Sequence, residues 1–144
     1  MKVELEKVVD PAQEAALIKA VEVTDNIQYA IEMLENNCRS IPVIQEDQTR
    51  MVRTDKIYYA ESVDKRTYVY TRENCYETKL RLYETEERLG ANFFRCSKAL
   101  VINLRKIKGV RSEINGRMLA ELLNGEEIVI SRSYVKDLKR KLGL

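Results

Sequence analysis

The chain has 144 residues, of which 44% are hydrophobic and 33% charged, with three Cys and no His. That length suffices for one domain with its own core, or for one domain and a short extension. No apolar run approaches the roughly 20 residues of a membrane helix, and no signal-peptide pattern opens the chain, so we expect a cytoplasmic protein. Without His, and with its Cys widely spaced, the sequence excludes a zinc site of ordinary spacing and disfavours a disulfide framework.

Charge is distributed unevenly along the chain. Residues 1–90 carry 13 Lys and Arg against 18 Asp and Glu, a net charge of −5, whereas residues 91–144 carry 12 against 5, a net charge of +7. A basic segment attached to an acidic body is typical of a protein that meets nucleic-acid phosphates. A solvated charged face gives the same counts, so the asymmetry supports a nucleic-acid hypothesis only beside a motif.

The first 46 residues are expected to form a small α/β extension. Charged and apolar residues alternate over residues 2–9, which predicts a short half-buried strand. Residues 12–23 fit a helix by their alanines or one face of a strand, and we favour the strand. Thr24 is a good N-cap for a helix that should end near Asn36-Asn37. Its apolar stripe is explained by core packing or, alternatively, by a dimer interface.

The middle of the chain alternates β-rich segments with turns. Pro42 favours an edge or entry strand, because Pro cannot donate to a strand ladder. The tyrosines of two later segments should pack across neighbouring strands, with a base-stacking platform as the alternative. A helix is expected over residues 79–89, ended by Gly90. The strands are expected at residues 41–44, 50–53, 57–62, 66–71 and 74–77.

Two Asn-Gly pairs organise the C-terminal part. Asn115-Gly116 and Asn124-Gly125 are the strongest hairpin signals in the chain. They predict three consecutive strands, the first of which carries one cationic face. Ser131 can then cap a final cationic helix. The expected ranges are 105–111, 117–123 and 127–130 for the strands and 132–142 for the helix.

Residues 92–103 combine apolar anchors with polar side chains that a core normally excludes. Two Phe lie at one end of this segment and the apolar run 100–102 at the other. A segment held at both ends would present the polar side chains between them to phosphates or base edges. An ordinary surface turn between two strands is the alternative. The polar side chains are Arg95, Ser97 and Lys98.

Two motifs of the chain carry a family resemblance. The first is Phe94-Arg95-Cys96-Ser97-Lys98-Ala99-Leu100-Val101-Ile102-Asn103-Leu104, and the second is Ser131-Arg132-Ser133-Tyr134-Val135-Lys136 with the basic segment after it. In this order and at this distance they resemble the LytTR DNA-binding domain family of bacterial transcription regulators, over about residues 49–144. Ser97 replaces a common His and Ala99 a common Ser, so the preferred DNA sequence does not follow from the resemblance.

The resemblance implies an α+β fold that is predominantly β, with short antiparallel sheets and a few helices, over residues 47–144. It also implies that loops read double-stranded DNA in the major groove. The family's base and backbone contacts fall at Ser97, Lys98, Arg132 and Ser133, while Asn103 should fix the loop. Among these, Arg132 is the expected base contact, because its planar fork suits guanine O6 and N7. The nearby cations Arg95, Lys106, Lys108 and Arg117 complete the candidate DNA-binding set.

No enzyme, cofactor or small-molecule substrate is expected. The two cations beside Cys96 suggest a lowered thiol pKa and a redox role as an alternative, but no base is available to orient the thiol. We expect a homodimer on double-stranded DNA and, by resemblance to stand-alone regulators of this type, a small membrane protein as inhibitor. The competing hypothesis is a non-enzymatic adaptor whose basic face docks an acidic protein.

Overall fold

The chain divides into two compact units, Met1–Asn37 and Cys38–Leu144. The computed structural model describes residues 1–34 and 39–144. The N-terminal unit contains a 3-10 helix, η1 (Pro11–Gln13), and the helix α1 (Asp25–Leu34). The Thr24 hydroxyl accepts a hydrogen bond from the backbone N–H of Ile27 at 3.4 Å, which confirms the predicted helix start. The predicted helix end near residues 36–37 lies outside the described residues.

The two strands predicted in the extension are wrong. Residues 2–8 have no regular secondary structure, and within residues 12–23 only the last part of η1 is regular. Val3, Leu5 and Leu17 are 85%, 89% and 81% exposed. Alternation predicts which side chains share a face, but a strand also needs a neighbour for its backbone N–H and C=O groups. In the described ranges no strand pairs with these residues.

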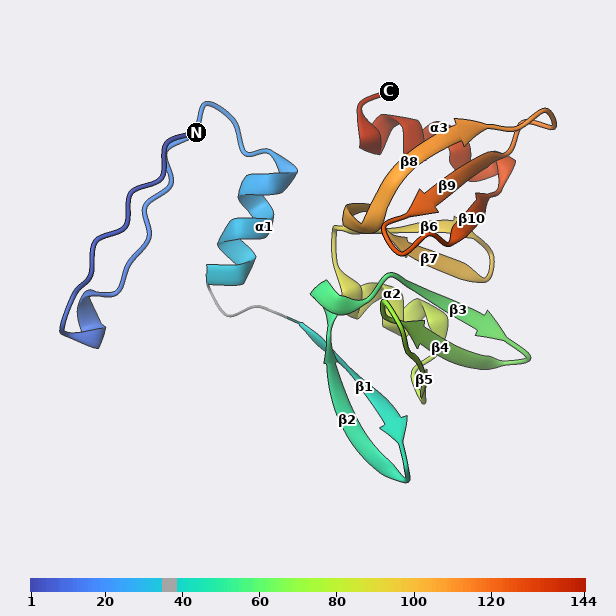
Figure 1. Cartoon of the computed structure of the whole chain (residues 1–144), viewed down its shortest axis with the longest axis horizontal. Helices are drawn as coiled ribbons and strands as arrows, with labels where there is room; N and C mark the ends of the chain where they lie inside the picture. Colours follow the sequence, from blue (N-terminus) through green and yellow to red (C-terminus); the bar gives the residue numbers. More distant parts are fainter. Residues whose placement is uncertain (35–38) are drawn as a thin grey trace. The chain divides into compact units, whose positions relative to one another are not determined.

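Within its described residues the C-terminal unit contains ten strands in two antiparallel sheets, two α-helices and two short 3-10 helices, η2 (Thr54–Lys56) and η3 (Leu104–Lys106) (Figure 1). The larger sheet is built from β1 (Ser40–Gln45), β2 (Gln48–Arg53), β3 (Tyr59–Val63), β4 (Arg66–Tyr70), β5 (Cys75–Thr78), β6 (Phe93–Ser97) and β7 (Leu100–Asn103). The smaller sheet contains β8 (Ile107–Ser112), β9 (Met118–Leu122) and β10 (Glu127–Ile130), and the helices are α2 (Leu82–Leu89) and α3 (Arg132–Leu142). The strand orders are β2-β1-β5-β4-β3-β7-β6 and β10-β9-β8. The expected α+β, predominantly β fold is confirmed.

Strand β1, which holds Pro42, is the first strand of the C-terminal unit, as the entry-strand alternative expected, but it is not an edge strand. It lies between β2 and β5, so β2 is the edge strand rather than the strand that holds Pro42. Pairing of β1 with β5 is confined to Ile44 and Glu77, and the carbonyl of Pro42 accepts the Thr78 hydroxyl at 2.8 Å instead. β1 is paired with β2 over its whole length, although it precedes residue 47, where we expected the DNA-binding domain to begin.

Side chains that alternate along the strands of the larger sheet build two cores. In β7, Val101 packs with Leu82 and Leu89 of α2, whereas the next residue, Ile102, packs against β9, β10 and Leu138 of α3. Val101 and Ile102 are both fully buried. The larger sheet is therefore a middle layer, with α2 on one face and the smaller sheet with α3 on the other. Burying each such side chain stabilises the fold by about 1.5–3 kcal/mol.

Local signals explain where the elements begin and end. Helix α2 begins three residues later than predicted, because the Thr78 hydroxyl accepts the backbone N–H of Leu80 in a bend before the helix. Gly90 ends α2 with a φ of +86°, and both predicted Asn-Gly hairpins form. Of the helices in the described ranges, none is long and apolar enough to cross a bilayer.

The tyrosines of β3 and β4 pack across the sheet, as expected. Tyr59 and Tyr70 are opposite each other, with stacked rings whose centroids are 4.3 Å apart. The buried Tyr59 also donates a hydrogen bond from its hydroxyl to Glu126, in the β9–β10 turn, at 2.6 Å. Burial, and then this hydrogen bond, raise the pKa of Tyr59 far above its usual range. The contact links the larger sheet to the smaller one.

We expect Tyr59→Phe to lower the free energy of unfolding at pH 7 by about 1 kcal/mol, because the link to Glu126 is lost. Above pH 10 the unfolded chain releases the Tyr59 proton while the folded protein keeps it, so wild-type stability falls as pH rises. In the variant this fall should be shallower by about 1.4 kcal/mol per pH unit. Urea unfolding between pH 7 and 11 measures both effects. Tyr83→Phe, on the exposed side of α2, is the control at pH 7, and equal losses in the two variants would contradict the prediction.

Candidate nucleic-acid interface

The segment 92–103, expected to be held at both ends, is a hairpin of β6 and β7 with Lys98-Ala99 at its turn. Its apolar anchors are confirmed, since Phe94, Val101 and Ile102 are buried. A β-bulge interrupts β6: Arg95 is paired with Val101, but Ser97 is already paired with Leu100. Bulges bend a strand and redirect its side chains. The bulge therefore sets the direction in which the turn leaves the core.

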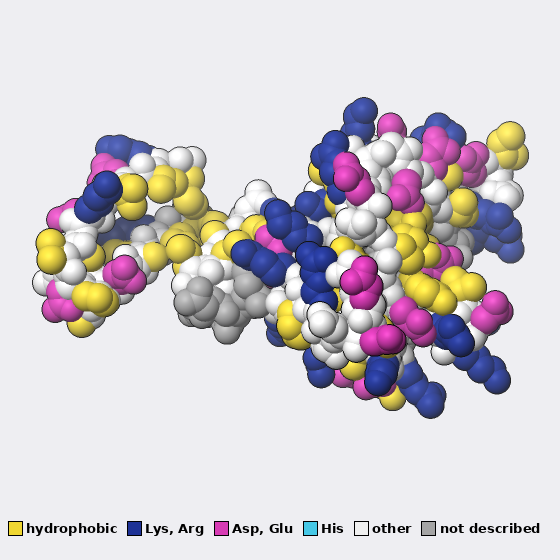
Figure 2. Space-filling model, turned by 60° about the horizontal axis from the view of Figure 1, so that its bottom comes forward, with side chains coloured by type: hydrophobic (Ala, Val, Ile, Leu, Met, Phe, Trp, Pro, Cys, Tyr) yellow, Lys and Arg dark blue, Asp and Glu magenta, His cyan; other side chains and the backbone are white. Residues whose placement is uncertain are grey.

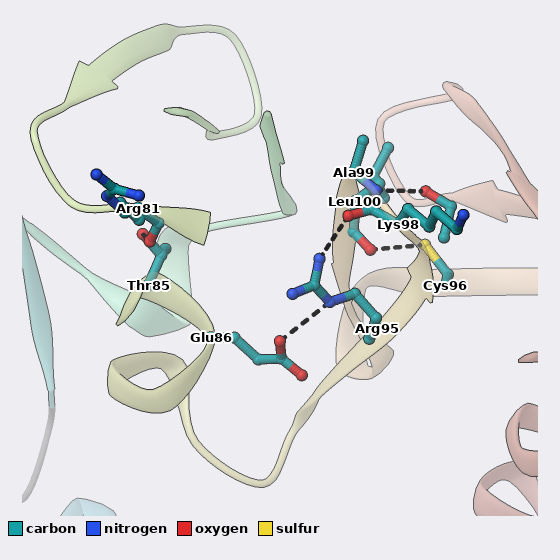
Figure 3. Close-up of polar contacts among 9 residues, drawn as sticks. Arg81, Thr85, Glu86, Arg95, Cys96, Lys98, Ala99 and Leu100 are labelled. Carbon is teal, nitrogen blue, oxygen red and sulfur yellow. Dashed lines mark hydrogen bonds and ion pairs between the residues drawn. The ribbon is translucent and has the colours of Figure 1, made fainter. Parts of the chain in front are cut away.

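Arg95 connects this turn to helix α2 (Figure 3). Its Nε donates to Glu86 of α2 at 3.1 Å, and its Nη1 donates to the carbonyl of Lys98 at 2.7 Å. The side chain is only 24% exposed. A planar guanidinium that bridges helix and turn in this way holds both in one geometry. Lys98 is left as the exposed cation of the turn.

The Ser97 hydroxyl also takes part in the turn. It accepts the backbone N–H of Ala99 at 3.3 Å. A hydroxyl has one donor proton besides its acceptor lone pairs, so Ser97 can still donate to an external acceptor. Ser97 is half-buried, which keeps that proton close to a defined position.

Cys96 is a core residue, and the expected lowering of its thiol pKa is wrong. Its side chain is fully buried, and its Sγ donates to the carbonyl of Leu100 at 3.5 Å. Burial raises the pKa of the Cys96 thiol to about 12, because desolvation outweighs the attraction of the neighbouring Arg95. A thiol with that pKa is not a nucleophile near neutral pH.

Helix α3 begins beside the β6–β7 hairpin. The backbone N–H of Ser131 donates to the carbonyl of Cys96 at 2.9 Å. One turn along α3, the Tyr134 ring meets the Phe94 ring edge to face, with centroids 6.4 Å apart, and Leu138 is fully buried in the same core. These contacts hold the start of α3 in place. The exposed Arg132 and Ser133 are thereby brought next to the turn that holds Ser97 and Lys98.

The β8–β9 turn, residues 113–117, is the third segment at this place. Gly116 has a φ of +82°, and a Cβ there would stand 3.0 Å from Cδ of Arg132. The backbone of the turn therefore lies against the Arg132 side chain, and Arg117 follows at once. Local pattern predicted the turn at Asn115-Gly116, but not this contact across the fold. We call the three segments, residues 97–99, 113–117 and 131–133, the convergent surface.

The cations of the convergent surface differ in their partners from two of the other predicted cations, Arg95 and Lys108. Lys98, Arg117 and Arg132 are exposed and form no ion pair within residues 1–34 and 39–144. By contrast, Arg95 is paired with Glu86, and Lys108 with Glu121 at 3.8 Å. Figure 2 shows Lys and Arg of the C-terminal unit interspersed with Asp and Glu on the face in view. Lys98, Arg117 and Arg132 are thus available to a phosphate without breaking an ion pair, whereas Arg95 and Lys108 are not.

Lys106 and Lys108 are not brought to the convergent surface. Lys106 precedes β8, whose six residues extend about 20 Å before the turn at residues 113–117 begins. The Lys106 ammonium lies over the Tyr58 ring, 5.2 Å from its centroid. Asn103 has the structural role expected of it, because its buried amide donates to the carbonyl of Ile57 at 2.8 Å and accepts the N–H of Arg105 at 3.0 Å.

The described residues offer no metal centre, since no three His, Cys, Asp or Glu side chains gather among them. Apart from Glu113, whose carboxylate lies 3.6 Å from Arg111, the convergent surface presents hydrogen-bond donors and positive charge. Guanidinium, ammonium, hydroxyl and helix N-terminal N–H groups all favour anionic or acceptor-rich ligands. Nucleic-acid phosphates and base edges meet that description.

Comparison with known proteins agrees with this chemistry. A family model described as the LytTr DNA-binding domain matches residues 47–143. Among solved structures, the LytTr DNA-binding domain of a methyl-accepting/DNA response regulator from Bacillus cereus superposes with a TM-score of 0.69 at 29% identity, covering 74% of this chain and 98% of that one. Strand order and helix placement thus follow a known DNA-binding fold.

Curated relatives include three named regulators. The chain is 32% identical to the transcriptional regulatory protein LytR of Staphylococcus aureus over 123 residues, which cover 83% of this chain and 50% of LytR. Identity is 30% to the transcriptional regulatory protein YpdB of Escherichia coli and 29% to the sensory transduction protein LytT of Enterococcus faecalis, each over 73% of this chain and 44% of the relative. The chain thus spans about half the length of the curated relatives it matches.

We expect Gly116→Ala and Gly125→Ala each to lower the free energy of unfolding by about 1–2 kcal/mol, because both positions have φ near +85°. Only the first should disturb Arg132, since a Cβ at Gly125 meets nothing within 4 Å. Urea unfolding measures stability, and the NMR signal of the Arg132 Nε–H reports its surroundings. A signal that moves equally in both variants, or in neither, would contradict the contact.

Proposed function

Because the chain belongs to the LytTr DNA-binding domain family, we propose that it is a bacterial transcription regulator that binds double-stranded DNA sequence-specifically. The observation that carries the proposal is the convergence of three exposed cations, Lys98, Arg117 and Arg132, from three segments far apart in sequence; none of the three has an ion pair within the described residues. A rigid basic surface built from turns can enter the major groove, which is wide enough to admit protein elements and carries a distinct pattern at each base pair.

The roles in this complex follow from side-chain chemistry. Arg132 is the proposed base contact, since its planar fork suits guanine O6 and N7. Lys98 and Arg117 neutralise flanking phosphates. Ser133, in the first turn of α3, adds a hydroxyl to the N–H groups of the helix N-terminus, where an anion is favoured. Ser97 donates its remaining proton to a phosphate or a base acceptor.

Arg95 is proposed as a positioning residue rather than a DNA contact. Its guanidinium already donates to Glu86 and to the carbonyl of Lys98, and it would have to release both to reach DNA. We assign Arg95 the function of holding the turn with Lys98 in a fixed position beside Arg132.

Assembly and location belong to the same proposal. We propose a cytoplasmic homodimer on a repeated site, with a small membrane protein as a further partner, and no catalytic activity. The apolar side chains of the N-terminal unit support self-association, since Val21 is fully exposed and Val23 and Leu34 are 66% and 61% exposed. Light scattering of the full chain, alone and with a duplex carrying two copies of its site, measures how many protein copies associate in the free state and in the DNA complex.

We expect Arg132→Ala to weaken binding to the specific duplex by about 1–3 kcal/mol, that is by about 5- to 150-fold, while binding to a shuffled duplex changes far less. The matched control is Arg140→Ala, which removes the same charge from the other end of α3, where Arg140 lies 3.6 Å from Asp137. Fluorescence anisotropy with the DNA upstream of the gene measures both affinities.

Two results would count against the proposal. Arg132→Ala could leave the preference for the native duplex unchanged, which removes Arg132 as the base contact. The wild-type protein could instead bind native and shuffled duplexes equally and weakly, with steep salt dependence. That second result would favour the adaptor hypothesis, in which the basic surface docks an acidic protein.

The expected contacts of Lys106 and Lys108 with phosphates have a separate test. If each neutralises one phosphate, Lys106→Ala and Lys108→Ala should each flatten the plot of log affinity against log salt by about one unit of slope. Lys79→Ala, a control remote in sequence from every proposed contact, should leave the slope unchanged. Unchanged slopes in the first two variants would confine the DNA contact to the convergent surface, from whose β8–β9 turn Lys106 is separated by the whole length of β8.

A further inference from the structure

The β8–β9 turn carries an apolar side chain that the fold does not use. Ile114 is fully exposed, more so than any other large hydrophobic side chain described in the C-terminal unit. A β-branched residue at the tip of a hairpin is unusual, because turns favour Gly, Asn, Asp, Ser and Pro. Ile114 therefore contributes nothing to either core and keeps an apolar surface in contact with water.

The turn that holds Ile114 is well defined. The backbone N–H of Glu113 donates to the carbonyl of Arg117 at 2.8 Å, and the N–H of Gly116 donates to the carbonyl of Glu113 at 3.3 Å. Asn115 closes the turn further, because its side-chain oxygen accepts the N–H of Arg117 at 3.4 Å. The position of Ile114 is thus fixed by its neighbours on both sides.

The same turn lies against the proposed base contact. Gly116, two residues after Ile114, approaches Cδ and Cγ of Arg132 so closely that a Cβ would stand 3.0 Å and 3.3 Å from them. A ligand that meets the Arg132 guanidinium therefore meets the β8–β9 turn as well. Arg117, three residues after Ile114, is exposed and unpaired within the described residues, so Ile114 lies at the rim of the convergent surface.

An exposed apolar group at the rim of a basic surface suits one feature of DNA. In the major groove the C5 methyl of thymine is the apolar group that bases present, and it distinguishes a T·A pair from the other three pairs. We propose that Ile114 is a specificity-determining residue that contacts the C5 methyl of a thymine near the base read by Arg132. This inference rests on the proposed function, since it assumes that the convergent surface enters the major groove.

The experiment removes that methyl group and nothing else. The full chain first selects duplexes from a random-sequence library, and the tightest one is then prepared with each thymine replaced singly by deoxyuridine. For the wild-type protein, one position should show a loss of about fourfold in affinity, the value expected for one buried methyl group. Ile114→Ala should bind the parent duplex more weakly and bind thymine and deoxyuridine equally at that position.

Two controls separate this contact from general effects. Leu123→Ala removes an apolar side chain, 50% exposed, next to the other hairpin turn and should keep the fourfold discrimination. Ile114→Val, which retains a branched apolar end, should keep part of it. Because Ile114 is fully exposed, circular dichroism and unfolding of its variants should match the wild-type protein.

The outcomes distinguish the inference from the function on which it rests. If no sequence is enriched, or if native and shuffled duplexes bind alike, the proposed function itself fails. If specific binding holds but every thymine tolerates deoxyuridine, or if Ile114→Ala keeps the full discrimination, the inference is overturned and the function stands. A loss of affinity that is equal for specific and shuffled duplexes would also overturn it, since Ile114 would then act without reading a base.

Discussion

Burial of the β6–β7 hairpin on both of its faces is the constraint on which the rest of the structure depends. Val101 faces the α2 core, and Ile102 faces the core of the smaller sheet and α3, with no exposure in either case. A slip of one residue in strand register would exchange the two faces, so the hydrophobic pattern fixes the register. The place of the Ser97–Lys98 turn follows from that register and from the bulge before it.

The convergent surface is assembled by backbone contacts rather than by its own charged side chains. The hydrogen bond from Ser131 to the carbonyl of Cys96 joins α3 to β6, and the close approach of Gly116 to Arg132 joins the β8–β9 turn to α3. The exposed cations, which repel one another, thus do not have to hold the surface together. A surface that is ordered before it meets a ligand loses less conformational entropy on binding.

Ion pairs neutralise part of the basic excess that residue counts give for residues 91–144. The basic excess of residues 91–144 is spread over strands and helix, but Lys108, Arg111 and Arg140 have carboxylates within 4 Å. Exposed pairs of this kind add little to stability. Their effect is to reduce the positive potential close to Lys108, Arg111 and Arg140.

The sequence by itself determined the elements with strong local signals. Two Asn-Gly turns, Gly90 at a helix end, Thr24 at a helix start and the apolar anchors at the two ends of residues 92–103 predicted hairpins, helices and core correctly. It also identified Arg132 and Lys98 as candidate contacts, through their place in a family motif. Alternation over residues 2–9 misled, because a strand exists only where another strand supplies hydrogen-bond partners.

Only the tertiary structure decided which of the candidate cations act together. Arg95 and Lys98 are three residues apart, yet one is paired with a glutamate of α2 and the other is exposed. Lys106 and Arg117 lie before and after β8, so the length of that strand separates them. Gly116 and Arg132 are distant in sequence, yet they touch. Ion pairing and proximity depend on packing between elements, and no local pattern of residues encodes that packing.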